Sequence, residues 1–266
     1  MAKISRSYGK LSVFEAFLIR GLKFVNVLYQ NHIKGRWFSA FLLPIRHFLA
    51  FLFYYLNRRD EIVKEKKYGI DTAGIQYIID TSHAQDAGYY EPTPYSRLES
   101  LLSKLVLTPD DVFIDIGCGK GRVVCCMATR PIRKVIGIEM IPDLADIAKQ
   151  NAITHPNQTP IEIIQGDAAS IDMSEGTIYY MYNPFGKQTM SHVLANIYHS
   201  LQTNPRPIRI VYVYPRHASS IDAQQWLERE EEEIGLYCIW RSCYNSSKEK
   251  MVIGEQGKGI AGSVGR

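Results

Sequence analysis

The fold of this chain is decided by residues 112–122, VFIDIGCGKGR. The first five residues form a short apolar run that carries one acid, Asp115, near its end. Such runs are typical of parallel strands that helices cover on both faces. Gly117, Gly119 and Gly121 then let the backbone turn sharply and let a ligand lie against main-chain atoms. The pattern predicts a buried strand that ends in a ligand-binding turn.

Further apolar runs follow at helix-length intervals. Predicted strands cover residues 134–139, 161–166, 177–182 and 208–214, and predicted helices cover 120–129, 142–153 and 187–201. Strands that alternate with helices in this way indicate a doubly wound α/β fold with a parallel sheet. Residues 236–244 and 248–254 are predicted strands with no helix between them, so we expect an antiparallel hairpin there.

An acid stands at the end of each of the first three predicted strands, namely Asp115, Glu139 and Asp167. The carboxyl ends of parallel strands meet at one edge of the sheet, so these acids point at one ligand that lies across the switch point. Glu139 is suited to accept both hydroxyls of a ribose, and Asp167 to accept from an exocyclic amine. The glycine spacing differs from the dinucleotide fingerprint G-x-G-x-x-G, which opens its helix on a pyrophosphate. The ligand therefore has an amine, a ribose and an adenine, without a phosphate.

This constellation resembles the class I S-adenosylmethionine-dependent methyltransferases over residues 90–255. The resemblance implies a Rossmann-like, seven-stranded sheet, parallel except for a terminal antiparallel hairpin, with S-adenosyl-L-methionine as the cofactor. It also implies that Asp115 and the three glycines hold the methionine end, Glu139 the ribose, and Asp167 with Ala168 the adenine. Methyl transfer requires no metal, and the sequence offers no metal-ligand cluster.

The fourth predicted strand ends in Tyr182-Asn183-Pro184-Phe185. Amino-group methyltransferases of this class carry Asn/Asp-Pro-Pro-aromatic here, and this chain lacks the second proline. The Asn183 side-chain oxygen and the carbonyl before Pro184 can accept hydrogen bonds from an amine, and Phe185 can lie against a cation. We therefore expect these residues to be catalytic. The alternative interpretation is a strand-ending turn, because Asn-Pro is a common turn dipeptide.

The same segment, Asn-Pro-Phe-Gly before a helix, resembles the Dot1-type lysine methyltransferases. So does the loop YEPTPY at residues 90–95, which in that family and in the related small lysine methyltransferases covers the methionine moiety. The resemblance implies that Tyr90, Thr93 and Tyr95 close the cofactor pocket. It favours a protein amine as the methyl acceptor.

Other charged groups have several interpretations. An alkylammonium acceptor must lose a proton before it is methylated, and the candidates for accepting that proton are Glu91, Tyr95 and His192. Lys120 and Arg122 stand inside the glycine loop, and we expect them to lie in solvent at a helix start; the alternative is that they steer an anionic substrate. The acidic run at residues 228–233, which contains Arg229, is expected on a solvated helix face, with a docking patch for a basic substrate as the alternative.

Charge is divided unevenly along the 266 residues. Residues 1–67 hold 13 Lys/Arg and four Asp/Glu, a net charge of +9, and the remainder has a net charge of −5, which gives +4 in total. Residues 11–30 are predicted to be helical, and residues 37–56 reach a membrane-spanning length but have a proline, an arginine and a histidine at their centre. Three interpretations of this front stay open: a helical cap on the catalytic body, an interfacial helix pair on an anionic membrane, or a span.

We therefore predict a basic, apolar helical region at 1–67, a methyltransferase domain at 68–255 and a flexible tail at 256–266. Five cysteines without paired spacing indicate reduced thiols in a cytoplasmic protein, with peripheral membrane contact through residues 11–56 as one interpretation. We expect methyl transfer to a nitrogen, such as that of a protein lysine. The alternatives are O-methylation of a small metabolite or lipid-linked sugar, and a catalytically inactive cofactor-binding scaffold. Nucleic acid is not favoured as a partner, because no Lys/Arg cluster lies near the predicted active-site loops.

Overall fold

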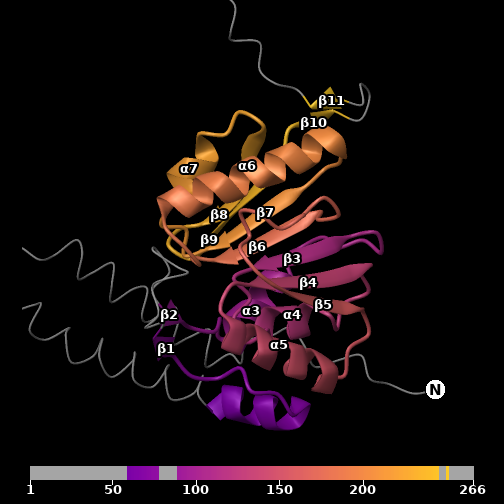
Figure 1. Ribbon diagram of the computed structural model, residues 1–266, viewed down its shortest axis with the longest axis vertical. Helices are drawn as coiled ribbons and strands as arrows, with labels where there is room; N and C mark the ends of the chain where they lie inside the picture. The colour runs from indigo at the N-terminus through magenta and orange to yellow at the C-terminus, as the bar shows by residue number, and fades with distance from the viewer. Residues whose placement is uncertain (1–58, 78–88, 246–249, 252–266) are drawn as a thin grey trace, which may run out of the picture.

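The computed structural model describes residues 59–77, 89–245 and 250–251 (Figure 1). The predicted helices at 11–30 and 37–56, with the membrane interpretation that depends on them, lie outside the described residues, as does the tail at 256–266. The division of the chain at residue 67 stays a prediction. Among the residues that the structure describes, no helix is long and apolar enough to cross a membrane.

A single sheet of seven strands forms the centre of the molecule, in the order β5-β4-β3-β6-β7-β9-β8. Its strands are β3 (Val112–Ile116), β4 (Lys134–Glu139), β5 (Ile161–Gln165), β6 (Ile178–Tyr182), β7 (Arg209–Val213), β8 (Leu227–Glu233) and β9 (Tyr237–Ser242). The helices are α3 (Tyr95–Leu102), α4 (Arg122–Met127), α5 (Pro142–Thr154), α6 (Lys187–Thr203) and α7 (Ala218–Asp222). Two short pairs lie outside the main sheet: β1 (Gln76–Tyr77) with β2 (Tyr89–Tyr90), and β10 (Tyr244–Asn245) with β11 (Lys250–Met251). Residues 59–68 are also helical.

Helices cover both faces of the sheet (Figure 1). Alternate residues of β3 point to opposite faces: Val112, Ile114 and Ile116 share a buried cluster with α6 and α7, whereas Phe113 shares one with α3, α4 and α5. Because both faces are buried, the central strands read as near-continuous apolar runs. The predicted α/β fold with a Rossmann-like seven-stranded sheet is confirmed.

The path of the chain through the sheet creates a switch point beside β3. Strands β3, β4 and β5 step outward in one direction, and the chain then returns to place β6 on the other side of β3. All the pairings among these strands and between β6 and β7 are parallel, whereas β9 is antiparallel to both β7 and β8. Ligands bind open α/β sheets at the carboxyl ends of the strands that flank such a switch point.

The terminal hairpin differs from the prediction in its members. The hairpin of the seven-stranded sheet is formed by β8 and β9, whereas the predicted pairing of 236–244 with 248–254 is present only as the short antiparallel pair β10–β11 outside that sheet. The acidic run at 228–233, expected on a helix, is the body of edge strand β8, so that prediction is wrong. These side chains are almost all exposed, and the run therefore lacks the apolar alternation that marks a half-buried strand. Pairing with β9, rather than a local pattern, sets its conformation.

Candidate active site

The glycine loop, residues 117–121, joins β3 to α4 beneath a cavity of about 460 Å³. All three of its glycines have positive φ angles, that of Gly119 being 54°. A Cβ atom on Gly119 would lie 2.3 Å from the ring of Tyr90. Only glycine therefore satisfies both the backbone conformation and the available space at this position.

The cavity is walled by the carboxyl ends of the neighbouring strands and by the loop before α3. It is lined by most of the residues predicted for the site: Tyr90, Thr93, Asp115, Gly117, Gly119, Glu139, Asp167, Ala168, Asn183, Pro184 and Phe185. These residues come from segments far apart in the sequence, and the sheet topology brings them together. Their roles toward a ligand remain predictions.

Two predicted site residues lie outside the cavity wall. Gly121 precedes α4 as its N-cap, and a Cβ atom there would lie 3.2 Å from the Ala148 side chain, so this glycine permits close packing of α4 on α5. Tyr95 is the first residue of α3, and its side chain turns inward and is 1% exposed. Its ring lies under the Arg122 guanidinium, 4.4 Å from centroid to Cζ, and burial raises the pKa of its hydroxyl. This placement supports a role behind the cavity wall and not direct contact with a ligand.

Asp115 presents a buried carboxylate to the cavity. The residue is 2% exposed, and no described residue donates a hydrogen bond to its side chain. Burial raises the pKa of this carboxyl well above its ordinary value, and the neighbouring Glu139 charge raises it further. An unpaired buried carboxylate is costly, and a bound cation would offset that cost. A bound ammonium group would therefore favour the charged form of this carboxyl.

Glu139 is fixed by backbone groups on both of its carboxylate oxygens. Gly119 N donates to Oε2 at 2.8 Å, and Ile141 N donates to Oε1 at 2.9 Å. Burial raises the pKa of Glu139, and the backbone hydrogen bonds act in the opposite direction. The carboxylate thus ties the glycine loop to the start of α5, and each oxygen keeps a further lone pair for a ligand hydroxyl.

The third acid shapes the turn after β5. Asp167 is exposed, and its Oδ1 accepts a hydrogen bond from Ala169 N at 2.9 Å. Ala168 is buried beside it, and its carbonyl accepts from Asn196 Nδ2 of α6 at 3.0 Å. The turn is therefore held by the Asp167 side chain on one side and by Asn196 of α6 on the other.

Asn183 adopts a strained backbone conformation at the end of β6. Its φ angle is 46°, in the left-handed region, which asparagine adopts more readily than most residues other than glycine but which is disfavoured before a proline. Its Oδ1 accepts a hydrogen bond from the Tyr212 hydroxyl of β7 at 2.9 Å. Strain of this kind is retained where the surrounding structure enforces it, commonly at functional sites. Sequence reasoning missed Tyr212, because an aromatic residue within a buried strand resembles ordinary core.

A second cavity, of about 790 Å³, adjoins the first. The two cavities share a wall made of Glu91, Tyr182, Asn183, Pro184 and Phe185. The second cavity continues past Tyr214, whose ring centroid lies 5.4 Å from that of Tyr182. Tyr214 follows β7 with a φ angle of 48° and precedes Pro215, so it repeats the strained conformation of Asn183 at the end of the neighbouring strand.

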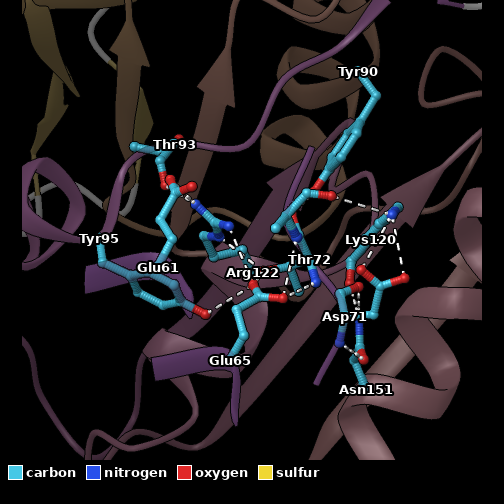
Figure 2. A network of polar contacts seen from close by, with 11 residues as sticks. Glu61, Glu65, Asp71, Thr72, Tyr90, Thr93, Tyr95, Lys120, Arg122 and Asn151 are labelled. Atoms are coloured by element: carbon cyan, nitrogen blue, oxygen red, sulfur yellow. Dashed lines mark hydrogen bonds and ion pairs between the residues drawn. The ribbon is translucent and has the colours of Figure 1, made fainter. Parts of the chain in front are cut away.

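Lys120 and Arg122 do not lie in solvent, and this prediction was wrong. The Arg122 side chain is 2% exposed and that of Lys120 is 12% exposed. Residues 69–75, which we call the strap, follow the helix at 59–68 and contact both side chains (Figure 2). The glycine motif indicated a turn, but nothing local to it shows that a segment some fifty residues upstream contacts it.

Comparison with known proteins gives related results. The family model described as Histone methylation protein DOT1 matches residues 81–160. A histone-lysine N-methyltransferase, H3 lysine-79 specific, from Dictyostelium discoideum is 28% identical over 176 residues, which covers 58% of this chain and 10% of that protein. A protein-lysine N-methyltransferase from Saccharolobus islandicus (strain REY15A) is 28% identical over 94 residues, 35% of this chain and 58% of that protein. Among solved structures, a TehB-like SAM-dependent methyltransferase from Corynebacterium glutamicum ATCC 13032 Kitasato has a TM-score of 0.42 at 17% identity, over 57% of this chain and 88% of that one.

The sheet order, the cavity at the strand ends and the sequence matches agree with the resemblance of the chain to the class I S-adenosylmethionine-dependent methyltransferases. Within that class, its sequence is similar to histone and protein lysine N-methyltransferases. The chain spans 10% and 58% of the lengths of the two curated relatives.

Proposed function

We propose that this chain transfers a methyl group from S-adenosyl-L-methionine to the side-chain nitrogen of a protein lysine. The observation that carries the proposal is the position of Asn183, Pro184 and Phe185 on the wall between the two cavities. A group on that wall can face a methyl donor in one cavity and an acceptor in the other. Two relatives whose names specify lysine methylation support the choice of acceptor.

The first cavity fits the cofactor. Asp115 would accept hydrogen bonds from the ammonium group, Glu139 from the ribose hydroxyls, and Asp167 from the adenine amine, whereas Tyr90 and Thr93 would cover the methionine end. Gly119 and Gly117 leave the main chain accessible on the cavity floor. When bound, the cofactor supplies a methyl group activated by a positively charged sulfur. The chain itself contributes orientation and the exclusion of water.

The shared wall suits an alkyl amine. The Tyr212 hydroxyl holds the Asn183 side chain, so that the second lone pair of Oδ1 and the Asn183 carbonyl can accept from the acceptor nitrogen. The rings of Tyr182 and Tyr214 would contact the methylene stem of a lysine. Phe185 would lie against the cationic end of the same group.

A lysine acceptor must become neutral before the methyl group is transferred. Of the three candidate proton acceptors, Glu91 and His192 line the first cavity and Tyr95 does not. Glu91 also lines the second cavity, and its exposed carboxylate is therefore the group placed to accept the proton of an entering ammonium. His192 projects from α6 on the other side of the first cavity.

The proposal is tested by following the methyl group. The purified full chain is incubated with methyl-labelled S-adenosylmethionine and a cell lysate, and the label is then separated into protein, lipid and small-molecule fractions. We expect label in protein that withstands mild base, which removes O-methyl esters, and that is released as methyl-lysine by complete hydrolysis. Asn183→Ala is the matched control, because it should bind the cofactor product and leave the protein fraction unlabelled.

Other distributions of label contradict the proposal. Label in lipid or in small molecules would show O-methylation of a metabolite or lipid-linked sugar instead. Binding of S-adenosylhomocysteine without transfer to any fraction would show a cofactor-binding scaffold.

A further inference from the structure

Arg122 is a buried cation that the methyltransferase chemistry does not use. It begins α4 directly after the glycine loop, and its side chain is 2% exposed. Its Nη1 lies 2.9 Å from Glu61 Oε1, and its Nη2 lies 3.2 Å from Glu65 Oε1. Both carboxylates come from the helix at 59–68. Almost all of this helix lies before residue 68, where the predicted methyltransferase domain begins. A planar guanidinium satisfied on several sides fixes the relative positions of the groups around it.

The same guanidinium also holds the wall of the first cavity. Arg122 Nη1 donates to the carbonyl of Thr93 at 3.1 Å, and its Cζ lies 4.4 Å from the centroid of the Tyr95 ring. Thr93 lines the first cavity, and its hydroxyl lies 3.0 Å from that of Tyr180 on β6. Arg122 therefore connects the outer helix to the loop before α3.

Thr72 of the strap connects Arg122 to Tyr90 through hydrogen bonds (Figure 2). Arg122 Nε donates to Thr72 Oγ1 at 2.8 Å, and Glu65 Oε2 accepts from Thr72 N at 2.8 Å. The Thr72 carbonyl accepts a hydrogen bond from the Tyr90 hydroxyl at 2.6 Å. The ring of Tyr90 lies directly against Gly119, so the strap sets where this part of the cavity wall stands.

The strap is anchored a second time on the opposite side of the glycine loop. Asn151 of α5 donates to the carbonyls of Asp71 and Lys120, at 2.8 Å each, and accepts from Asp71 N at 2.9 Å. Lys120 Nζ donates to the Ala73 carbonyl at 3.3 Å. Hydrogen bonds thus join the strap to the glycine loop through Arg122 on one side and through Asn151 and Lys120 on the other. A shift of either segment therefore requires a shift of the other.

We propose that Arg122 is a positioning residue for the cofactor cavity: it clamps the helix at 59–68 and the strap onto the glycine loop, and so holds Tyr90 over Gly119. This inference rests on the proposed function in one respect, since it takes the first cavity to be the cofactor site. It gives the segment before the predicted domain a part in cofactor binding.

The test compares two arginines in the full chain. Arg122→Lys keeps the charge and removes the planar fork, and Arg206→Lys makes the same change at an arginine that donates to several carbonyls at the other end of the sheet. Titration calorimetry with S-adenosylhomocysteine and thermal unfolding are measured for both variants. We expect the Kd of Arg122→Lys to rise about tenfold or more, and that of Arg206→Lys to change less than about twofold. This difference in Kd should hold even if the two variants unfold at similar temperatures.

A second variant separates positioning from general destabilisation. Tyr90→Phe keeps the ring and removes only the hydroxyl that donates to Thr72. This variant should also raise the Kd for S-adenosylhomocysteine. If Arg122 acts through the strap, the Kd of the double variant should be no higher than the higher of the two single-variant Kd values. Should Arg122→Lys fail to fold, an unchanged Kd in Tyr90→Phe overturns the inference.

The outcomes distinguish the inference from the proposed function. Equal Kd values for Arg122→Lys and the unaltered chain, or independent effects in the double variant, overturn the inference alone. If the chain binds the cofactor product but methylates no protein, the proposed function fails and the inference stands. If the unaltered chain binds no cofactor product, both fail.

Discussion

Replacing Asp115 by asparagine should improve the stability of the free chain while weakening its cofactor binding. The Asp115 side chain is buried, receives no hydrogen bond from a described residue and stands near the charged Glu139. An unsatisfied buried polar group costs about 1–3 kcal/mol and a charged one costs more, so a neutral asparagine should add about 1–3 kcal/mol to the free energy of unfolding. For a chain of this size the Tm should rise by about 2–4 °C per kcal/mol.

The same change should reduce affinity for the cofactor. A hydrogen bond to a charged partner contributes about 1.5–3 kcal/mol, so loss of the carboxylate should raise the Kd for S-adenosylhomocysteine by roughly 10- to 100-fold. Calorimetry gives the Kd and a thermal melt gives the Tm. The matched control is Asp110→Asn, which removes an exposed carboxylate near the opposite end of β3 and should change neither quantity.

The pH dependence of stability also tests whether the Asp115 carboxylate destabilises the folded chain. The folded pKa of Asp115 lies above its ordinary value of 3.8, so the folded state binds the proton more tightly than the unfolded chain does. Stability of the unaltered chain should therefore fall as pH rises from the ordinary pKa through the raised one, and the asparagine variant should lack this contribution. A Tm that falls in Asp115→Asn, or a Kd that stays the same, refutes the reasoning.

Three further changes test other parts of the site, and a fourth serves as a control. Glu139→Gln replaces one acceptor oxygen by an amide that cannot accept from the backbone, and calorimetry should show the Kd for S-adenosylhomocysteine raised roughly 10- to 100-fold; an unchanged Kd would remove Glu139 from the cofactor site. Gly119→Ala brings a Cβ atom within 2.3 Å of the Tyr90 ring and should abolish measurable binding. As a control, a Cβ atom on Gly235 would meet no atom within 4 Å at a φ of +73°, so Gly235→Ala should lower the free energy of unfolding by only about 1–2 kcal/mol in a denaturant melt. Equal losses of cofactor-product binding in Gly119→Ala and Gly235→Ala would contradict the steric argument. Tyr212→Phe frees the Asn183 side chain and should lower turnover about tenfold or more while leaving the Kd for the cofactor product within about twofold, and a Kd that changes as much as turnover does would show a general structural effect.

Most of the central sheet is predictable because parallel strands that are buried on both faces need continuous apolar runs. Strands β3, β4 and β5 begin where the apolar runs begin, and the acids Asp115, Glu139 and Asp167 stand where those strands end. The carboxyl ends of such strands face one edge, so the cavity could be placed before any contact was known.

The remainder depends on contacts that the local sequence does not encode. Arg122 has the surroundings of a solvated helix start in its own segment, and its burial comes from residues of an upstream helix. Tyr212 is one aromatic residue in a buried strand, and only the pairing of β6 with β7 places its hydroxyl on Asn183. Tyr95 is the last residue of the loop at 90–95, for which the resemblance implies a part in closing the pocket, but its position as the first residue of α3 turns its side chain inward.

The acidic composition of β8 has a consequence for the chain in solution. This strand is the last of the sheet, and its glutamates are exposed along nearly its whole length. An edge strand is a template for pairing with another molecule, and the net negative charge of β8, which has five glutamates and one arginine, opposes that pairing between two copies. Acidification or high ionic strength weakens the repulsion, and self-association along this edge should then increase with protein concentration.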